Sequence, residues 1–222
     1  MNLTYAAATI ATVVGTTHAA AQVKPRAEDL PRGFRALGGV ELNRDSALSV
    51  FAKLGSAGER RVGSGHDVYR SWCYLIDDAG VPIVLELLSD ASEMGTAGHA
   101  VNVIYLRSGA SRSERKQCSS LVSHAPLTTA GGLRLGLTRK QVQAQLGVPT
   151  RRFRDSLVFE FESKEYMKKS SPEYAVWNAP QRRKSCFNGG EPFSTVSATV
   201  MVLFRGEHSV KIRLERYDQS TC

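Results

Sequence analysis

A pattern of glycine, strand and helix signals that occurs twice constrains the fold of this chain more than any other feature. The clearer copy, GGLRLGLTRKQVQAQLGVPT at residues 131–150, begins with Gly-Gly and then alternates apolar and polar residues. A looser copy, GGVELNRDSALSVFAKLGSA at residues 38–57, has the same order with one inserted residue. Both read Gly-Gly-apolar-charged-Leu, then a short amphipathic segment, then Leu-Gly. An internal repeat of this kind predicts a duplicated structural unit.

The second copy carries agreeing signals for the start and the end of a helix. Thr138 is followed three residues later by Gln141, which is the spacing of a capping box. Val142 and Leu146 lie four residues apart and therefore share one helical face. Gly147 suits the left-handed conformation that ends a helix. We expect a short helix here.

The first copy predicts the same elements more loosely. Asn43 is the expected N-cap and Gly55 the expected stop. An apolar stripe at helical spacing is formed by Ala47, Leu48, Phe51 and Leu54. In both copies the alternation just before the helix, at 38–42 and at 131–135, predicts a short strand.

Three runs rich in β-branched and aromatic residues follow each helical segment. They cover 71–76, 81–88 and 100–106 in the first half, and 157–161, 195–204 and 210–217 in the second. The last run alternates strictly, with apolar residues on one face and Lys211, Arg213 and Glu215 on the other. We therefore predict an α+β fold of two tandem repeats, each a short helical segment packed on an antiparallel sheet of about three strands. The first repeat would cover residues 22–120 and the second 121–222.

The first 21 residues have the character of an export signal. Residues 1–21 contain no Lys, Arg, Asp or Glu and end in Ala19-Ala20-Ala21, so a signal peptide cleaved before Gln22 is expected. The alternative is a disordered tail rich in Ala and Thr. Export predicts a periplasmic or secreted protein, and the absence of a cysteine at the cleavage point excludes lipid anchoring there.

Four cysteines fit an oxidising compartment. An even number in an exported chain predicts two disulfides. The placement of Cys73, Cys118, Cys186 and Cys222 favours pairing 73 with 118 and 186 with 222, one in each repeat. A crossed pairing, which would link the two repeats, is the alternative.

The string LRLGLTRKQVQAQLGVP, residues 133–149, resembles the BamE (SmpA/OmlA) family of outer-membrane assembly lipoproteins. That family shares a fold with the repeats of β-lactamase inhibitor proteins, which are exported and carry two repeats in tandem. The resemblance implies helical elements packed on an antiparallel sheet. It implies little about activity, because capping residues and a leucine stripe are structural devices. The chain departs from the lipoproteins in lacking a lipidated cysteine and in having two modules.

The candidate partner-binding residues lie in two basic regions. The connection at 164–193 is much longer than its counterpart at 77–80, and long connections are usually functional or disordered. Aromatic residues combined with arginine are typical of binding hot spots. The candidates are Tyr166, Tyr174, Trp177, Arg182, Arg183 and Lys184 in this insertion, with Arg151 and Arg152 as a separate basic cluster. Alternatively, the aromatic rings cover the end of the sheet and the charges are solvated.

Composition narrows the class of partner. With 29 Lys and Arg against 21 Asp and Glu, the net charge is +8, which suits an acidic envelope protein or another anionic envelope component. No nucleic-acid motif and no apolar run of membrane-spanning length occur.

Nothing in the sequence predicts a catalytic, metal or cofactor site. His66, His99, His124 and His208 form no H-E-x-x-H motif or other metal-ligand spacing. We therefore expect a non-enzymatic protein-binding module, acting as a scaffold or inhibitor. The alternative is an envelope hydrolase with an unrecognised active site, and convergence of His66, His99 and Asp67 in a cleft would favour it.

Overall fold

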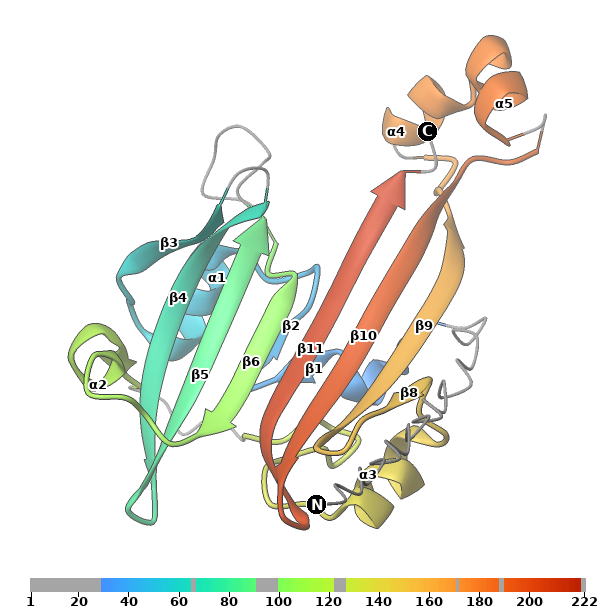
Figure 1. Cartoon of the computed structure of the whole chain (residues 1–222). Helices are drawn as coiled ribbons and strands as arrows, with labels where there is room; N and C mark the ends of the chain where they lie inside the picture. Colours follow the sequence, from blue (N-terminus) through green and yellow to red (C-terminus); the bar gives the residue numbers. More distant parts are fainter. Residues whose placement is uncertain are drawn as a thin grey trace, which may run out of the picture.

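The computed structural model describes residues 29–64, 67–90, 100–121, 127–170, 172–187 and 190–220. Within them the fold is mostly β (Figure 1). The strands of the large sheet are β3 (Glu59–Ser64), β4 (Asp67–Asp78), β5 (Val81–Asp90), β6 (Val103–Ser108), β7 (Ser119–Ser120), β8 (Arg151–Arg152), β9 (Ser156–Tyr166), β10 (Phe193–Arg205) and β11 (His208–Ser220). Their order is β3-β4-β5-β6-β11-β10-β9-β8, all antiparallel, with β7 added parallel to β4. The predicted signal peptide lies outside the described residues.

The helices are short and stand between groups of strands. They are the 3-10 helix η1 (Arg32–Phe34), α1 (Ala47–Leu54), α2 (Glu114–Gln117), α3 (Arg139–Leu146), α4 (Pro172–Trp177) and α5 (Pro180–Phe187). A separate two-stranded sheet pairs β1 (Ala36–Leu37) with β2 (Val40–Glu41). None of the helices in the described ranges is long and apolar enough to cross a membrane.

The prediction of an α+β fold of two tandem repeats, each a helical segment on its own sheet of about three strands, is wrong, because the described fold is mostly β with one large sheet and a few short helices. All six predicted strands exist, but β6 and β11 pair with each other, from Val103 opposite Glu215 to Arg107 opposite Lys211. The two halves therefore form one continuous sheet. The physical reason is that the last strand of each half would otherwise be an exposed edge with unpaired backbone groups, and pairing the two edges satisfies both.

The hydrophobic core crosses this junction without a break. Leu106 faces Ile212 and Ile104 faces Leu214 across the β6–β11 pair, and all four side chains are fully buried. Helices α1 and α3 pack their buried residues on the same face of the sheet and belong to the same cluster. The two predicted repeats, 22–120 and 121–222, therefore share one hydrophobic core.

Helix α3 confirms the signals of the second copy. The Thr138 side chain accepts a hydrogen bond from the Gln141 backbone N–H, and the Gln141 side chain accepts one from the Thr138 backbone N–H, which completes the capping box. Val142 and Leu146 are buried, and Gly147 has a φ of 77°.

Helix α1 follows its prediction only in part. Its N-cap is Ser46, because the predicted cap Asn43 occupies the left-handed region with φ 58°. Val50 is buried in place of Leu48, which is 64% exposed. The inserted residue in this copy therefore shifts the start of the helix and the face that it buries.

The two Gly-Gly pairs serve different purposes. Gly38 and Gly39 form the turn of the β1–β2 hairpin, with φ values of 62° and 77°. The strand predicted at 131–135 is absent. There Gly131 lies against the ring of Phe34, where a Cβ would come within 2.4 Å of Cζ. This glycine is required for close packing between the N-terminal segment and the second half.

Asp45 joins α1 to the hairpin before it. Its carboxylate accepts hydrogen bonds from the Glu41 backbone N–H at 2.7 Å, the Ser49 hydroxyl at 3.0 Å and the Lys53 ammonium at 2.6 Å. Burial by itself would raise the pKa of Asp45, but the hydrogen bonds and the charge of Lys53 outweigh burial and lower the pKa. Folding therefore favours the ionised carboxylate.

We expect Asp45→Asn to lower the free energy of unfolding by about 1–3 kcal/mol at neutral pH, because the pairing with Lys53 is lost. A lowered folded-state pKa contributes stability above the unfolded pKa, and this contribution disappears as the pH falls through the folded pKa. The gap between variant and wild type should therefore shrink at about pH 3, as measured by urea unfolding. Asp78→Asn, in an exposed turn, is the matched control. An equal gap at both pH values would contradict this account.

Candidate functional site

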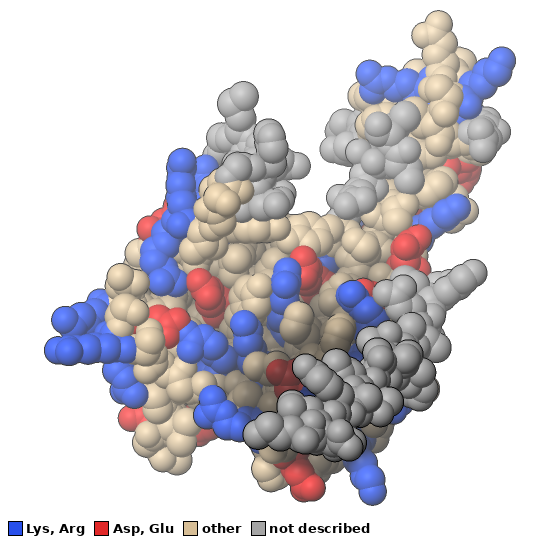
Figure 2. Space-filling model, in the orientation of Figure 1, with Lys and Arg blue, Asp and Glu red and all other residues tan. Residues whose placement is uncertain are grey.

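The large sheet has one face covered by the core and one face that we call the open face. Leu85, Ile104 and Leu214 point into the core on the covered face. Because side chains alternate along a strand, Glu86 and Tyr105 point to the opposite side. In Figure 2, Lys and Arg side chains are interspersed with Asp and Glu across the face turned to the viewer.

The strand register aligns the open-face residues in rows. The central row from β4 to β9 consists of Cys73, Glu86, Tyr105, Arg213, Met201 and Val158. The neighbouring rows contain Val84, Arg107, Lys211 and Leu203 on one side, and Leu88, Val103, Glu215, Thr199 and Glu160 on the other. Aromatic, cationic and anionic side chains therefore meet where β6 pairs with β11.

We call Glu86, Tyr105, Arg107, Lys211 and Arg213 the Tyr105 cluster. The Lys211 ammonium lies 4.8 Å from the centroid of the Tyr105 ring, and the Arg213 guanidinium carbon lies 5.4 Å from it. Such cation–π contacts orient both cations around the ring. Burial raises the pKa of the Tyr105 phenol, although the charge of Arg213 opposes the shift. The phenol is therefore neutral, and two cations lie near its ring.

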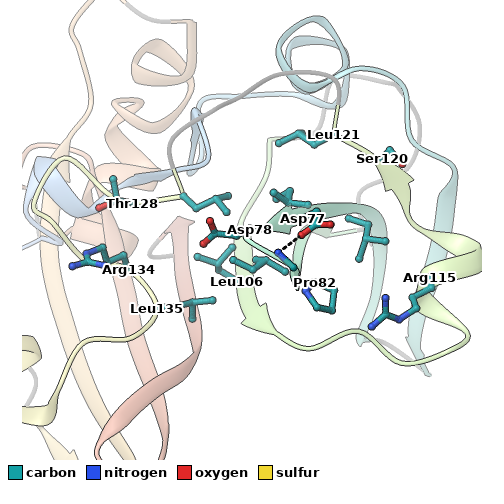
Figure 3. Close-up of a pocket in the computed structure, with 15 residues that line it drawn as sticks. Asp77, Asp78, Pro82, Leu106, Arg115, Ser120, Leu121, Thr128, Arg134 and Leu135 are labelled. Carbon is teal, nitrogen blue, oxygen red and sulfur yellow. Dashed lines mark hydrogen bonds between the residues drawn. The ribbon is translucent and has the colours of Figure 1, made fainter.

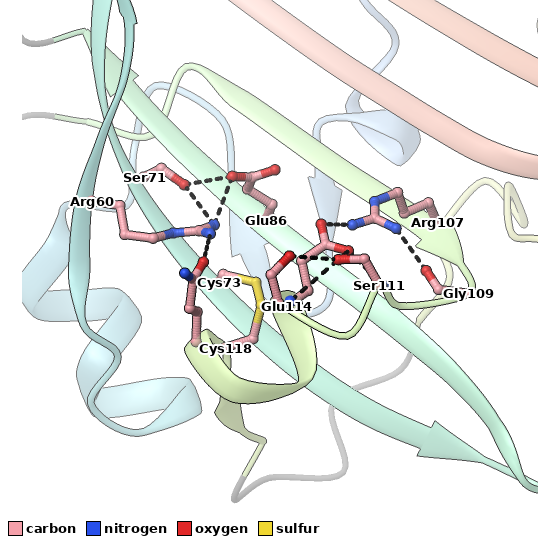
Figure 4. Close-up of polar contacts among 11 residues, drawn as sticks. Arg60, Ser71, Cys73, Glu86, Arg107, Gly109, Ser111, Glu114 and Cys118 are labelled. Atoms are coloured by element: carbon pink, nitrogen blue, oxygen red, sulfur yellow. Dashed lines mark hydrogen bonds and ion pairs between the residues drawn. A yellow bond between two sulfur atoms is a disulfide. The ribbon is translucent and has the colours of Figure 1, made fainter.

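Ion pairs hold the arginine side chains on the open face (Figure 4). The pairs around the cluster are Arg60–Glu86 at 3.0 Å, Arg213–Glu215 at 2.6 Å, and Arg107–Glu114. The Ser71 hydroxyl also donates to Glu86, at 2.6 Å. These contacts fix the side chains in place before any partner binds.

A small depression opens beside the cluster. It has a volume of about 260 Å³ and is lined by Val62, Glu86, Leu88, Tyr105, Arg107 and Lys211. Cofactors and drug-sized ligands bind in larger cavities, of about 300–1,000 Å³. The depression is smaller than such a cavity.

Helix α2 is fastened beside this depression by a disulfide. Cys73 is bonded to Cys118, with the two Cα atoms 4.7 Å apart and a sequence separation of 45 residues. This confirms the first predicted pairing. The second pairing, Cys186 with Cys222, involves a residue outside the described ranges. Glu114 of α2 pairs with Arg107, so the helix forms one wall of the open face.

We expect the double substitution Cys73→Ala with Cys118→Ala to lower the free energy of unfolding by about 2–4 kcal/mol. The sheet should persist while α2 loses its covalent attachment. Trypsin should then cleave more rapidly after Arg115 and Lys116, as followed by mass spectrometry. Reduced wild-type protein should behave like the variant. An unchanged cleavage rate in the variant would show that the disulfide does not hold α2.

A larger pocket of about 710 Å³ lies where the β4–β5 turn approaches residues 127–135 (Figure 3). Apolar side chains form much of its wall. The Asp77 carboxylate accepts a hydrogen bond from the Gly80 N–H at 2.7 Å and so stabilises the turn. Figure 3 shows Arg134 and Arg115 on opposite sides of the pocket. The charged groups drawn there do not converge as an acid–base pair or a nucleophile with its base would.

The predicted insertion forms a projection, which we define as the described residues of 164–193, from the end of β9 to the start of β10 (Figure 1). Its helices α4 and α5 carry Tyr174, Trp177, Arg182, Arg183 and Lys184. Trp177 packs edge-to-face on Phe187, with centroids 6.3 Å apart, and the Arg182 guanidinium lies 5.1 Å from the Trp177 ring.

The base of the projection continues this aromatic packing. Phe193 contacts Phe187 with centroids 5.4 Å apart and Tyr166 at 6.0 Å, and the Lys164 ammonium lies 4.4 Å from its ring. Tyr166 is nevertheless 64% exposed. The rings therefore stabilise the projection itself, and Tyr166 also remains accessible.

The predicted candidates do not form one site. Arg151 and Arg152 lie in β8, which pairs with the start of β9, whereas the projection follows the end of β9. Arg151 forms an ion pair with Glu160 on the open face. Arg152 is exposed.

Tyr105, Lys211 and Arg213 were not among the candidates predicted from the sequence. The alternation at 210–217 correctly placed Lys211 and Arg213 on one polar face, but an exposed strand face is the ordinary interpretation of such a pattern. Only the pairing of β11 with β6 brings Tyr105 opposite Arg213.

The expectations about catalysis remain predictions. His66, His99 and His124 lie outside the described ranges, while His208 is exposed, with a ring nitrogen 3.0 Å from the Gly136 carbonyl oxygen. Within the described part of the chain, no three His, Cys, Asp or Glu residues are grouped to hold a metal ion.

No protein-family model, curated protein or solved structure matches the chain. The resemblance to BamE-like lipoproteins and tandem-repeat inhibitors stays a prediction that rests on residues 133–149.

Proposed function

We propose that this chain is an exported, non-enzymatic protein-binding module that docks an acidic protein partner on the open face of its sheet. The observation that carries the proposal is the Tyr105 cluster at the centre of that face. Tyrosine and arginine dominate binding hot spots near the centres of interfaces. The cluster combines both types on paired strands, with its arginines already held by ion pairs.

The dimensions of the open face suit a protein partner. Eight strands side by side, at about 4.8 Å spacing, span about 35 Å. Apart from the two-residue edge strand β8, the strands range from the 6 residues of β6 to the 13 of β10 and β11, or about 20–40 Å at 3.3 Å per residue. The resulting area, on the order of 1,000 Å², matches the roughly 800 Å² that each partner buries in a standard interface.

Charge and compartment support the same function. A net charge of +8 favours the approach of acidic partners. The Cys73–Cys118 disulfide agrees with an oxidising compartment, as expected for a periplasmic or secreted protein. Whether binding serves inhibition or scaffolding depends on which surface of the partner is covered.

The projection is a second contact surface in this proposal. Its aromatic rings pack largely on one another, so fewer of them are available to a partner than the sequence suggested. Tyr166 and the basic residues of α5 are the candidates that remain there. We place the main contact on the open face because its side chains stand on paired strands.

The test compares two tyrosines. The partner is captured from envelope extract and culture medium with the wild-type chain, identified, purified and titrated by calorimetry. We expect Tyr105→Ala to weaken binding at least about tenfold, as for a central hot spot. Tyr166→Ala, the matched change on the projection, should weaken it less than about threefold. Both variants are first checked for wild-type thermal unfolding.

The opposite ranking would move the binding site to the projection. A partner that binds both variants as tightly as wild type would contradict both surfaces and the proposed function with them.

A further inference from the structure

The charges around Tyr105 do not balance. Arg60, Arg107 and Arg213 are each paired with a carboxylate of this chain. Lys211 faces Arg107 across the β6–β11 pair and lies two residues from Arg213. Among the described residues no carboxylate comes within ion-pair distance of its ammonium, whose close contact is the Tyr105 ring. The cluster and its ion pairs thus hold four cations but three carboxylates.

The surroundings of Lys211 disfavour its positive charge. Burial lowers the pKa of the ammonium, and the charges of Arg107 and Arg213 lower it further, with Glu86 opposing them. A negative charge placed beside Lys211 would offset this repulsion.

The depression defines the kind of group that fits. Val62, Leu88 and the Tyr105 ring offer apolar surface, and Lys211 and Arg107 contribute the positive charge. A short apolar stem that ends in one negative charge matches both features. A single charge suffices, because the surplus is one cation and the carboxylates of the cluster repel a second negative charge.

We propose that Lys211, Tyr105 and Arg107 form a recognition position for the side-chain carboxylate of an Asp or Glu residue of the protein partner. This inference rests on the proposed function and names the chemistry of the partner at its centre. The carboxylate would accept a hydrogen bond from the Lys211 ammonium, while its aliphatic stem would lie against the Tyr105 ring.

The first experiment needs no partner. The blocked peptide acetyl-Gly-Glu-Phe-Gly-amide is titrated into isotope-labelled full-length chain and followed by NMR. We expect saturable shifts at Lys211, Arg107 and Tyr105. The same peptide with Gln in place of Glu should produce none. Lys211→Arg should preserve the response and Lys211→Gln should abolish it, while Lys140→Gln, at an exposed lysine on α3, should leave it unchanged.

Other results of this experiment would overturn the inference. Absence of shifts at Lys211 with the Glu peptide would do so, as would equal shifts with the Gln peptide. A response to inorganic phosphate that exceeds the response to the peptide would identify a general anion site instead. None of these results bears on whether a protein docks on the open face.

The second experiment uses the purified partner and separates the two proposals. Lys211→Gln should weaken partner binding at least about tenfold and reduce its salt dependence, and Lys211→Arg should restore most of the affinity. If Tyr105→Ala weakens binding but Lys211→Gln does not, the open face remains the docking surface and the carboxylate position is wrong. If neither does, both proposals fail.

Discussion

Pairing of β6 with β11 is the interaction on which the rest of this structure depends. Each strand would otherwise be the exposed edge of a small sheet, with unpaired backbone groups available to other chains. Their pairing closes both edges and joins two core faces into one. It also sets Tyr105 opposite Arg213 and Arg107 opposite Lys211. The β6–β11 pairing therefore produces both the continuous sheet and the candidate binding face.

The open face owes its character to contacts that limit motion. Ion pairs hold the arginines, and the Cys73–Cys118 disulfide fixes α2 beside them. Rigid side chains lose less conformational entropy on binding, which favours affinity and selectivity. Lys211 differs from the arginines in having no carboxylate partner among the described residues. A surface on which most cations have a carboxylate partner and one has none would bind a protein with a negative charge at that position more tightly than a protein without one.

The sequence predicted those elements whose signals are local. The Thr138–Gln141 capping box and Gly147 define α3 within a few residues, so the prediction was confirmed. Runs rich in β-branched and aromatic residues placed the six main strands for the same reason. The strand expected at 131–135 was wrong, because Gly131 is placed by the ring of Phe34, almost a hundred residues earlier, and local alternation carries no information about that contact.

By itself the sequence determined the six main strands and helix α3. It also determined which residues of 210–217 form the polar face, and it favoured the pairing of Cys73 with Cys118. Only the tertiary structure decided that the halves share one sheet and that a tyrosine and three cations meet at its centre. The reason is physical. Alternation along a strand fixes which side chains share a face, but any exposed edge can pair with another, so the choice of partner strand depends on the whole molecule.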